Sequence, residues 1–112
     1  MFISYANSKV KKQCTKFQQA KKDFPEKIAI KLHRHIAFIK ASENLESVNN
    51  FPTFNLHPLK GNREGYYAMD IDGRHSQYRL IVAFEDYTKE QVIYDAKSIS
   101  VIEITEVSKH YE

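Results

Sequence analysis

The sequence predicts an α+β fold, in which an N-terminal helical hairpin packs on one face of a mainly antiparallel sheet of about 4–5 strands. Two observations carry this prediction. The first half of the chain contains no glycine, whereas Gly61, Gly65 and Gly73 fall close together in the second half. Apolar residues recur at helical spacing before residue 46 and alternate as in strands from residue 66 onward.

The size and composition of the chain favour one folded domain spanning residues 1–112. An apolar content of 42% argues against disorder, and a single cysteine, Cys14, excludes an internal disulfide framework and a thiolate metal cluster. No stretch approaches the ~18 apolar residues of a membrane span. We therefore expect a cytoplasmic protein with no membrane segment, no metal site and no cofactor.

Two long helices are expected in the first half. Residues 9–24 form an amphipathic pattern that ends before Pro25, because the residue preceding a proline is pushed out of helical geometry. A second, more apolar pattern runs from about 25 to 46. The two helices should pair as a hairpin.

Strands are expected mainly in the second half, where the chain would form an antiparallel meander. In the segment 66–71, the side chains of Tyr67, Met69 and Ile71 would share one face. The expected strands are Phe2–Tyr5, Tyr66–Ile71, Tyr78–Phe84, Gln91–Tyr94 and Ile99–Val107.

Charge is distributed unevenly along the chain. Residues 1–40 carry ten Lys/Arg against two acidic residues, whereas residues 41–112 carry seven against twelve, giving +8 and −5. The lysines of the first helix are either a solvated face or a surface for RNA, whose binding would weaken as salt rises. The candidates for RNA contact there are Lys9, Lys12 and Lys16.

Two polar segments could carry chemistry. The loop that leads into the sheet holds His57, Lys60 and Arg63, and it is either a solvated turn or part of a site at the sheet rim. The C-terminal segment holds Lys109, His110 and Tyr111, and it is either part of a site or a frayed end without function.

Arg79 lies within an apolar strand, where an unpaired charge is rarely buried. It is either ion-paired to a nearby strand carboxylate or directed toward a working surface.

These side chains suit a phosphodiester substrate. Metal-independent RNA cleavage needs a base for the 2′-hydroxyl, an acid for the leaving 5′-oxygen and cations for the phosphorane. Histidine, with a reference pKa near 6.5, can serve as acid or base, and Arg and Lys supply positive charge.

The order of motifs resembles the RelE/ParE superfamily of bacterial toxins, most closely its HigB-like (plasmid maintenance killer) branch. The resemblance spans nearly the whole chain. Its motifs are the segments Leu59-Lys60-Gly61-Asn62-Arg63-x-Gly65-Tyr66-Tyr67, Tyr78-Arg79-Leu80-Ile81-Val82 and Glu106-Val107-Ser108-Lys109-His110-Tyr111.

The resemblance implies the toxin of a type II toxin–antitoxin pair, a metal-independent, ribosome-dependent mRNA endoribonuclease (an mRNA interferase). Its implied partners are a HigA-like helix-turn-helix antitoxin, the ribosome and mRNA, with operator DNA bound only through the toxin–antitoxin complex. Residues His57, Lys60, Arg79 and His110 match positions of the family's active site.

The chain departs from the family pattern at its end, where characterised members often have Asp-Tyr-His. Here Tyr111 follows His110, so the proton-transfer roles stay open among His57, His110 and Tyr111. Two alternatives also stay open: a ParE-type toxin that poisons DNA gyrase, and a catalytically inactive module that binds an antitoxin. The combination of His57, Lys60 and His110 argues against a pure inhibitor, which needs no proton shuttle.

Overall fold

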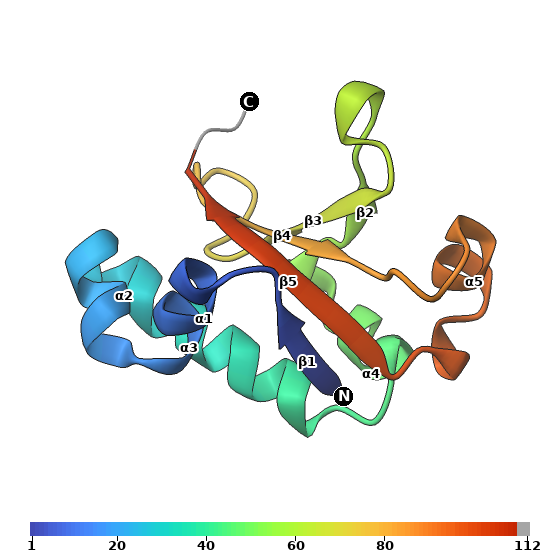
Figure 1. Cartoon of the computed structure of the whole chain (residues 1–112), viewed down its shortest axis with the longest axis horizontal. Helices are drawn as coiled ribbons and strands as arrows, with labels where there is room; N and C mark the ends of the chain where they lie inside the picture. The colour runs from blue at the N-terminus through green and yellow to red at the C-terminus, as the bar shows by residue number, and fades with distance from the viewer. Residues whose placement is uncertain (110–112) are drawn as a thin grey trace.

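The computed structural model of the chain describes residues 1–109, so the predicted site residues His110 and Tyr111 lie outside the described residues. After the short strand β1, four helices come first, and the remaining strands follow with helix α5 inserted before the last of them (Figure 1). The elements are β1 Phe2–Tyr5, α1 Ser8–Thr15, α2 Phe17–Asp23, α3 Glu26–Ala41, α4 Leu45–Asn49, β2 His57–Pro58, β3 Tyr66–Asp70, β4 Arg79–Ala83, α5 Lys89–Tyr94 and β5 Val101–Ser108. Three 3₁₀ turns, η1 Pro52–Phe54, η2 Gly61–Arg63 and η3 Ala96–Ser98, lie in the connections.

The strands form one sheet in the order β1-β5-β4-β3-β2. β1 pairs with β5 in parallel, and the other neighbours are antiparallel, which confirms the predicted α+β class. The ladder between β4 and β5 shifts register between Ile81 and Val82. At this bulge the Thr105 hydroxyl donates to the Ile81 carbonyl at 2.9 Å, so the irregular backbone keeps a partner.

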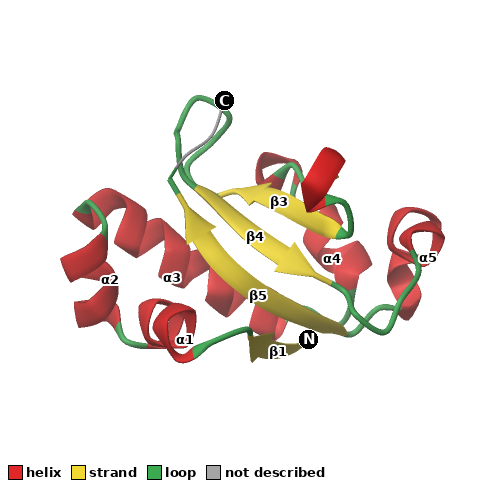
Figure 2. Ribbon diagram, turned by 45° about the horizontal axis from the view of Figure 1, so that its top comes forward, coloured by secondary structure: helices red, strands yellow, loops and turns green. Residues whose placement is uncertain are grey.

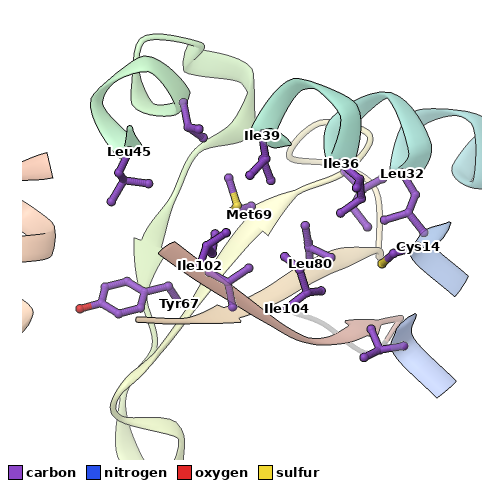
Figure 3. Close-up of a cluster of buried hydrophobic side chains, with 14 of the residues drawn as sticks. Cys14, Leu32, Ile36, Ile39, Leu45, Tyr67, Met69, Leu80, Ile102 and Ile104 are labelled. Atoms are coloured by element: carbon purple, nitrogen blue, oxygen red, sulfur yellow. The ribbon is translucent and has the colours of Figure 1, made fainter. Parts of the chain in front are cut away.

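The helices cover one face of the sheet, and the core lies between them (Figure 3). Leu32 and Ile39 of α3 and Leu80, Ile102 and Ile104 of the sheet are fully buried there. Burying each such side chain contributes about 1.5–3 kcal/mol relative to exposure. The expected face of Tyr67, Met69 and Ile71 belongs to this core, as predicted.

The expected single helix over residues 9–24 is wrong, because the chain leaves helical geometry at Lys16, with φ −120° and ψ 107°. The Thr15 hydroxyl donates to the Lys11 carbonyl at 2.6 Å, a local contact that competes with the helical ladder. The break frees the Gln13 carbonyl, to which His33 Nε2 donates at 2.9 Å. A tertiary contact from α3 therefore replaces the helical bond that the break removes.

The expected helix over 25–46 is also wrong in extent, because α3 ends at Ala41 and a separate helix begins at Leu45. Ser42 is extended, and its hydroxyl donates to the Phe38 carbonyl at 2.7 Å. Asn44 then caps α4 by accepting from the Ser47 N–H at 3.2 Å. The cap lets the chain turn back toward the core, where Leu45 is buried.

The expected strand over Gln91–Tyr94 is wrong, since this segment belongs to helix α5. Thr88 and Gln91 form a reciprocal capping box: the Gln91 N–H donates to the Thr88 hydroxyl, and the Thr88 N–H donates to the Gln91 side-chain oxygen. Only Val92 of this helix is buried, so a single apolar anchor decides which face packs inward.

Within residues 1–109, no α-helix lies over β3, β4 and β5 on the second face of the sheet, and in Figure 2 these strands lie in front of α3 and α4. We call this surface the open face. None of the helices in residues 1–109 has the combined length and apolar character that crossing a membrane requires.

Candidate functional site

Two rows of side chains cross the open face, and strand register defines both. The first row is His57, Ala68, Ile81 and Glu106, which pair in succession across β2, β3, β4 and β5. The second row is Asp70, Arg79 and Ser108. Directly paired residues point to the same side of a sheet, so the predicted residues His57 and Arg79 share one surface, on adjacent rows.

Arg79 is buried and held in place by its neighbours. Its Nε lies 3.0 Å from Asp70 Oδ1, and the two side chains are only 8% and 2% exposed. The guanidinium also donates to the backbone carbonyls of Ser76, Tyr78 at 2.9 Å and Arg74 at 2.9 Å. The sequence left open whether Arg79 is ion-paired to a strand carboxylate or directed toward a functional surface, and the structure shows the ion pair with Asp70. Arg79 therefore closes the connection between β3 and β4 onto the sheet.

His57 is connected to this buried pair through Asn55. The Asn55 side-chain amide donates to Asp70 Oδ2 at 3.4 Å, and the Asn55 backbone carbonyl lies 2.8 Å from His57 Nδ1. A carbonyl can only accept, so Nδ1 carries the proton when the ring is neutral. Nε2 is then the nitrogen with the lone pair, the form that a general base requires.

Asn55 has a left-handed backbone, with φ 49° and ψ 52°. Asparagine tolerates this region better than most residues. The conformation turns the chain between η1 and β2. The turn directs the carbonyl and the amide of Asn55 toward two different partners.

Lys60 and Arg63 lie in the connection between β2 and β3, which rises above the sheet in Figure 1. Gly61 and Gly65 have φ values of 68° and 95°, which favour glycine. Arg63 reaches β5, where its Nη2 lies 2.6 Å from Glu106 Oε1. Both partners are about half exposed, so the ion pair contributes at most about 1 kcal/mol. Its main consequence is to draw the connection over the first row.

The predicted RNA-binding lysines separate into two groups. Lys9 lines a groove of about 600 Å³ that runs between α1, α2 and β5 and also contains Lys22 and Glu106. The groove therefore leads from the helices to the acid that Arg63 binds. Lys12 and Lys16 are exposed on α1 and just after it, outside the groove lining. Lys109 is exposed beyond the end of β5.

The part of the open face nearest β1 is acidic. Glu103 pairs with Ala83 on β4 and with Ser4 on β1. Burial, together with Glu85 nearby, raises the pKa of the Glu103 carboxyl above its usual range. Cations therefore flank the β2 side and carboxylates the β1 side, and this field would orient a polyanion toward His57, Lys60 and Arg63.

Sequence reasoning missed three contributors to this arrangement: Asn55, Asp70 and Lys22. Asp70 could have been found as the nearest strand carboxylate to Arg79. Asn55 has no signature apart from its position two residues before His57. Lys22 is one of many lysines in this part of the sequence, and periodicity does not indicate which of them would line a groove. Across residues 1–109, no cluster of three or more His, Cys, Asp or Glu side chains is arranged to hold a metal ion.

Comparison with solved structures identifies the class of fold. The chain is similar to a structure described as a YoeB/ParE toxin from Agrobacterium tumefaciens, with a TM-score of 0.52 and 14% identity. The match covers 99% of this chain and 100% of that one. At this identity the likeness shows the fold alone, which is that of the RelE-like toxins.

The family follows from the sequence match. Residues 5–97 match the HigB-like toxins, described as RelE-like toxins of the type II toxin–antitoxin system HigB. The chain therefore belongs to this family. It is the toxin component of a type II pair, a class that acts with an antitoxin partner. No curated protein sequence matches the chain significantly.

Proposed function

We propose that this toxin is a ribosome-dependent endoribonuclease that cuts mRNA and thereby stops translation and growth. The observation that carries the proposal is the hydrogen bond from His57 Nδ1 to the Asn55 carbonyl, 2.8 Å long, which sets the tautomer of a histidine on the open face. That tautomer leaves Nε2 able to take a proton from a 2′-hydroxyl.

In this mechanism His57 is the base for the 2′-hydroxyl, which then attacks the adjacent phosphorus. The 5′-oxygen of the next nucleotide leaves and takes a proton from His110 or Tyr111, the two acid candidates beyond the described residues. Lys60 and Arg63 place positive charge where the phosphorane becomes more negative. Arg79 serves by holding the Asp70–Asn55 contacts behind His57, since its own donors point to Asp70 and to backbone carbonyls.

Docking on the ribosome would use the groove that contains Lys9 and Lys22, with Lys12, Lys16 and Lys109 adding attraction for ribosomal RNA. A HigA-like helix-turn-helix protein is the proposed antitoxin, and operator DNA would be bound only through their complex. Action on ribosomes implies a cytoplasmic location.

The test is to add the toxin to purified ribosomes that are translating a defined mRNA. Cleavage of the mRNA by the toxin is then mapped by primer extension. His57→Gln should lower the cleavage rate by about 10²–10⁴-fold, the usual worth of a positioned proton-transfer group. Lys60→Gln should lower it by about 10²-fold, as when one preorganised charge-stabilising group is removed. The matched control is Lys97→Gln, because Lys97 is an exposed lysine on η3. This variant should cleave mRNA at the normal rate.

Cleavage that survives His57→Gln at the normal rate would refute the assigned base. Growth arrest with intact mRNA and an induced DNA-damage response would instead support the gyrase-poisoning alternative.

A further inference from the structure

A pocket at the β2 edge of the sheet is not explained by the chemistry above. It has a volume of about 420 Å³ and lies between η1, β2 and helix α5. Its wall includes Phe51, Phe54, Asn55, His57 and Val92. Volumes of 300–1,000 Å³ are typical of sites that enclose small ligands.

Three stacked rings end at this pocket. His35 stacks on Phe54 with ring centroids 3.7 Å apart and an interplanar angle of 17°. Phe54 stacks in turn with Phe51, at 5.1 Å and 20°. His35 is buried, whereas Phe51 is 45% exposed. The stack therefore begins in the core and ends in an accessible aromatic ring.

Polar groups at the pocket suit the edge of a heterocyclic base. Asn49 is exposed at the end of α4 and lines the pocket, and its amide offers both a donor and an acceptor. Asn55 also lines it. The lining, which lies wholly within the described residues, contains no Lys, Arg, Asp or Glu. A neutral, flat, polar-edged group matches this chemistry better than a charged one does.

The position of the pocket connects it to RNA on the open face. β2 is the edge strand of the sheet, and His57 belongs both to the first row of the open face and to the pocket wall. An RNA chain whose phosphates contact Lys60 and Arg63 can therefore place one base over this edge of the sheet. Single-stranded RNA is commonly bound in this way, by unstacked bases that stack on aromatic side chains.

We propose that this pocket binds one unstacked nucleobase of the RNA, stacked on Phe51 and contacted at its edge by the Asn49 amide. The proposal rests on the proposed function for the identity of the polymer. It assigns a role to α5, because Val92 and Ile93 of that helix close the pocket.

The test uses short single-stranded RNA carrying the fluorescent base 2-aminopurine, whose emission falls when it stacks on an aromatic ring. Wild-type toxin should quench the emission saturably. Phe51→Leu keeps an apolar side chain but removes the ring, and it should raise the dissociation constant by about 5- to 100-fold, the usual worth of one base–aromatic stack. Phe51→Tyr should restore quenching. Tyr94→Leu is the matched control, because Tyr94 is 83% exposed on α5 and is not part of the pocket wall.

The outcomes separate the pocket from the catalytic proposal. Lack of saturable quenching by the wild type, or unchanged quenching in Phe51→Leu, overturns the base site even if mRNA is cleaved. Phe51-dependent quenching without any mRNA cleavage keeps the base site and rejects the nuclease. If Phe51→Leu releases the antitoxin while quenching is unchanged, the occupant is a protein segment and the base site is wrong.

Discussion

Replacing Arg79 by methionine tests whether its guanidinium is structural. The change keeps an unbranched apolar stem but leaves the Asp70 carboxylate, 2% exposed, with the Asn55 amide at 3.4 Å as its remaining neighbour in the network described above. Removing one partner of a buried ion pair typically costs 3–5 kcal/mol. Against a total stability of about 5–15 kcal/mol for a domain, this would consume a large share.

The measurement is unfolding by urea and by heat, each followed by circular dichroism. Arg79→Met should lower the free energy of unfolding by about 3–5 kcal/mol and the midpoint temperature by roughly 10–20 °C. The double variant Arg79→Met with Asp70→Leu should recover part of that loss, because no uncompensated charge remains buried. A change within about 0.5 kcal/mol for Arg79→Met, as at an ordinary surface site, would refute the reasoning and make a direct phosphate contact by Arg79 the better interpretation.

Three further predictions concern the remaining structure. Burial lowers the pKa of His35 to about 4 from a reference of 6.5. Between these two pH values the unfolded chain binds a proton that the folded chain does not, so about 3 kcal/mol of stability is lost as pH falls from 6.5 to 4. In urea titrations His35→Phe should remove this pH dependence, and His75→Phe, at an exposed position, should not. Burial raises the pKa of the Cys14 thiol to about 12, so it should react with Ellman's reagent at pH 8 only in denaturant. Thr88→Ala should cost about 0.5–2 kcal/mol in thermal unfolding, through loss of the α5 cap; no measurable change would show that this cap is dispensable.

Periodicity located the helical and strand halves of the chain, but it placed several boundaries wrongly. The pattern from Val10 to Phe24 continues across Lys16, yet the helix does not. No proline or glycine in this stretch forbids a continuous helix. The contact of His33 with the Gln13 carbonyl, twenty residues away in sequence, helps to stabilise the broken form. Helix α5 differs in this respect, since Thr88 and Gln91 formed a capping signal that was readable and outweighs the apolar pattern.

The candidate site was predictable in its parts and not in its connections. His57, Lys60 and Arg63 stand out because of their side-chain chemistry and their place before a strand. The contact of Arg63 with Glu106 joins residues 43 positions apart, and no sequence rule gives that pairing. The path from Arg79 through Asp70 and Asn55 to His57 likewise depends on strand register, which brings these groups within 2.8–3.4 Å of one another.

The order and spacing of residues are enough to predict the α+β class, the sheet face formed by Tyr67, Met69 and Ile71, and the types of side chain available for phosphate chemistry. These follow from the spacing of apolar residues and from local turn chemistry, which act over a few residues. Three features depend on the folded arrangement: Arg79 pairs with Asp70, the His57 lone pair is on Nε2, and Phe51 ends a stack of rings in the pocket that His57 also lines. Those outcomes depend on which distant backbone groups meet when the sheet closes, because each buried polar atom must find its partner there.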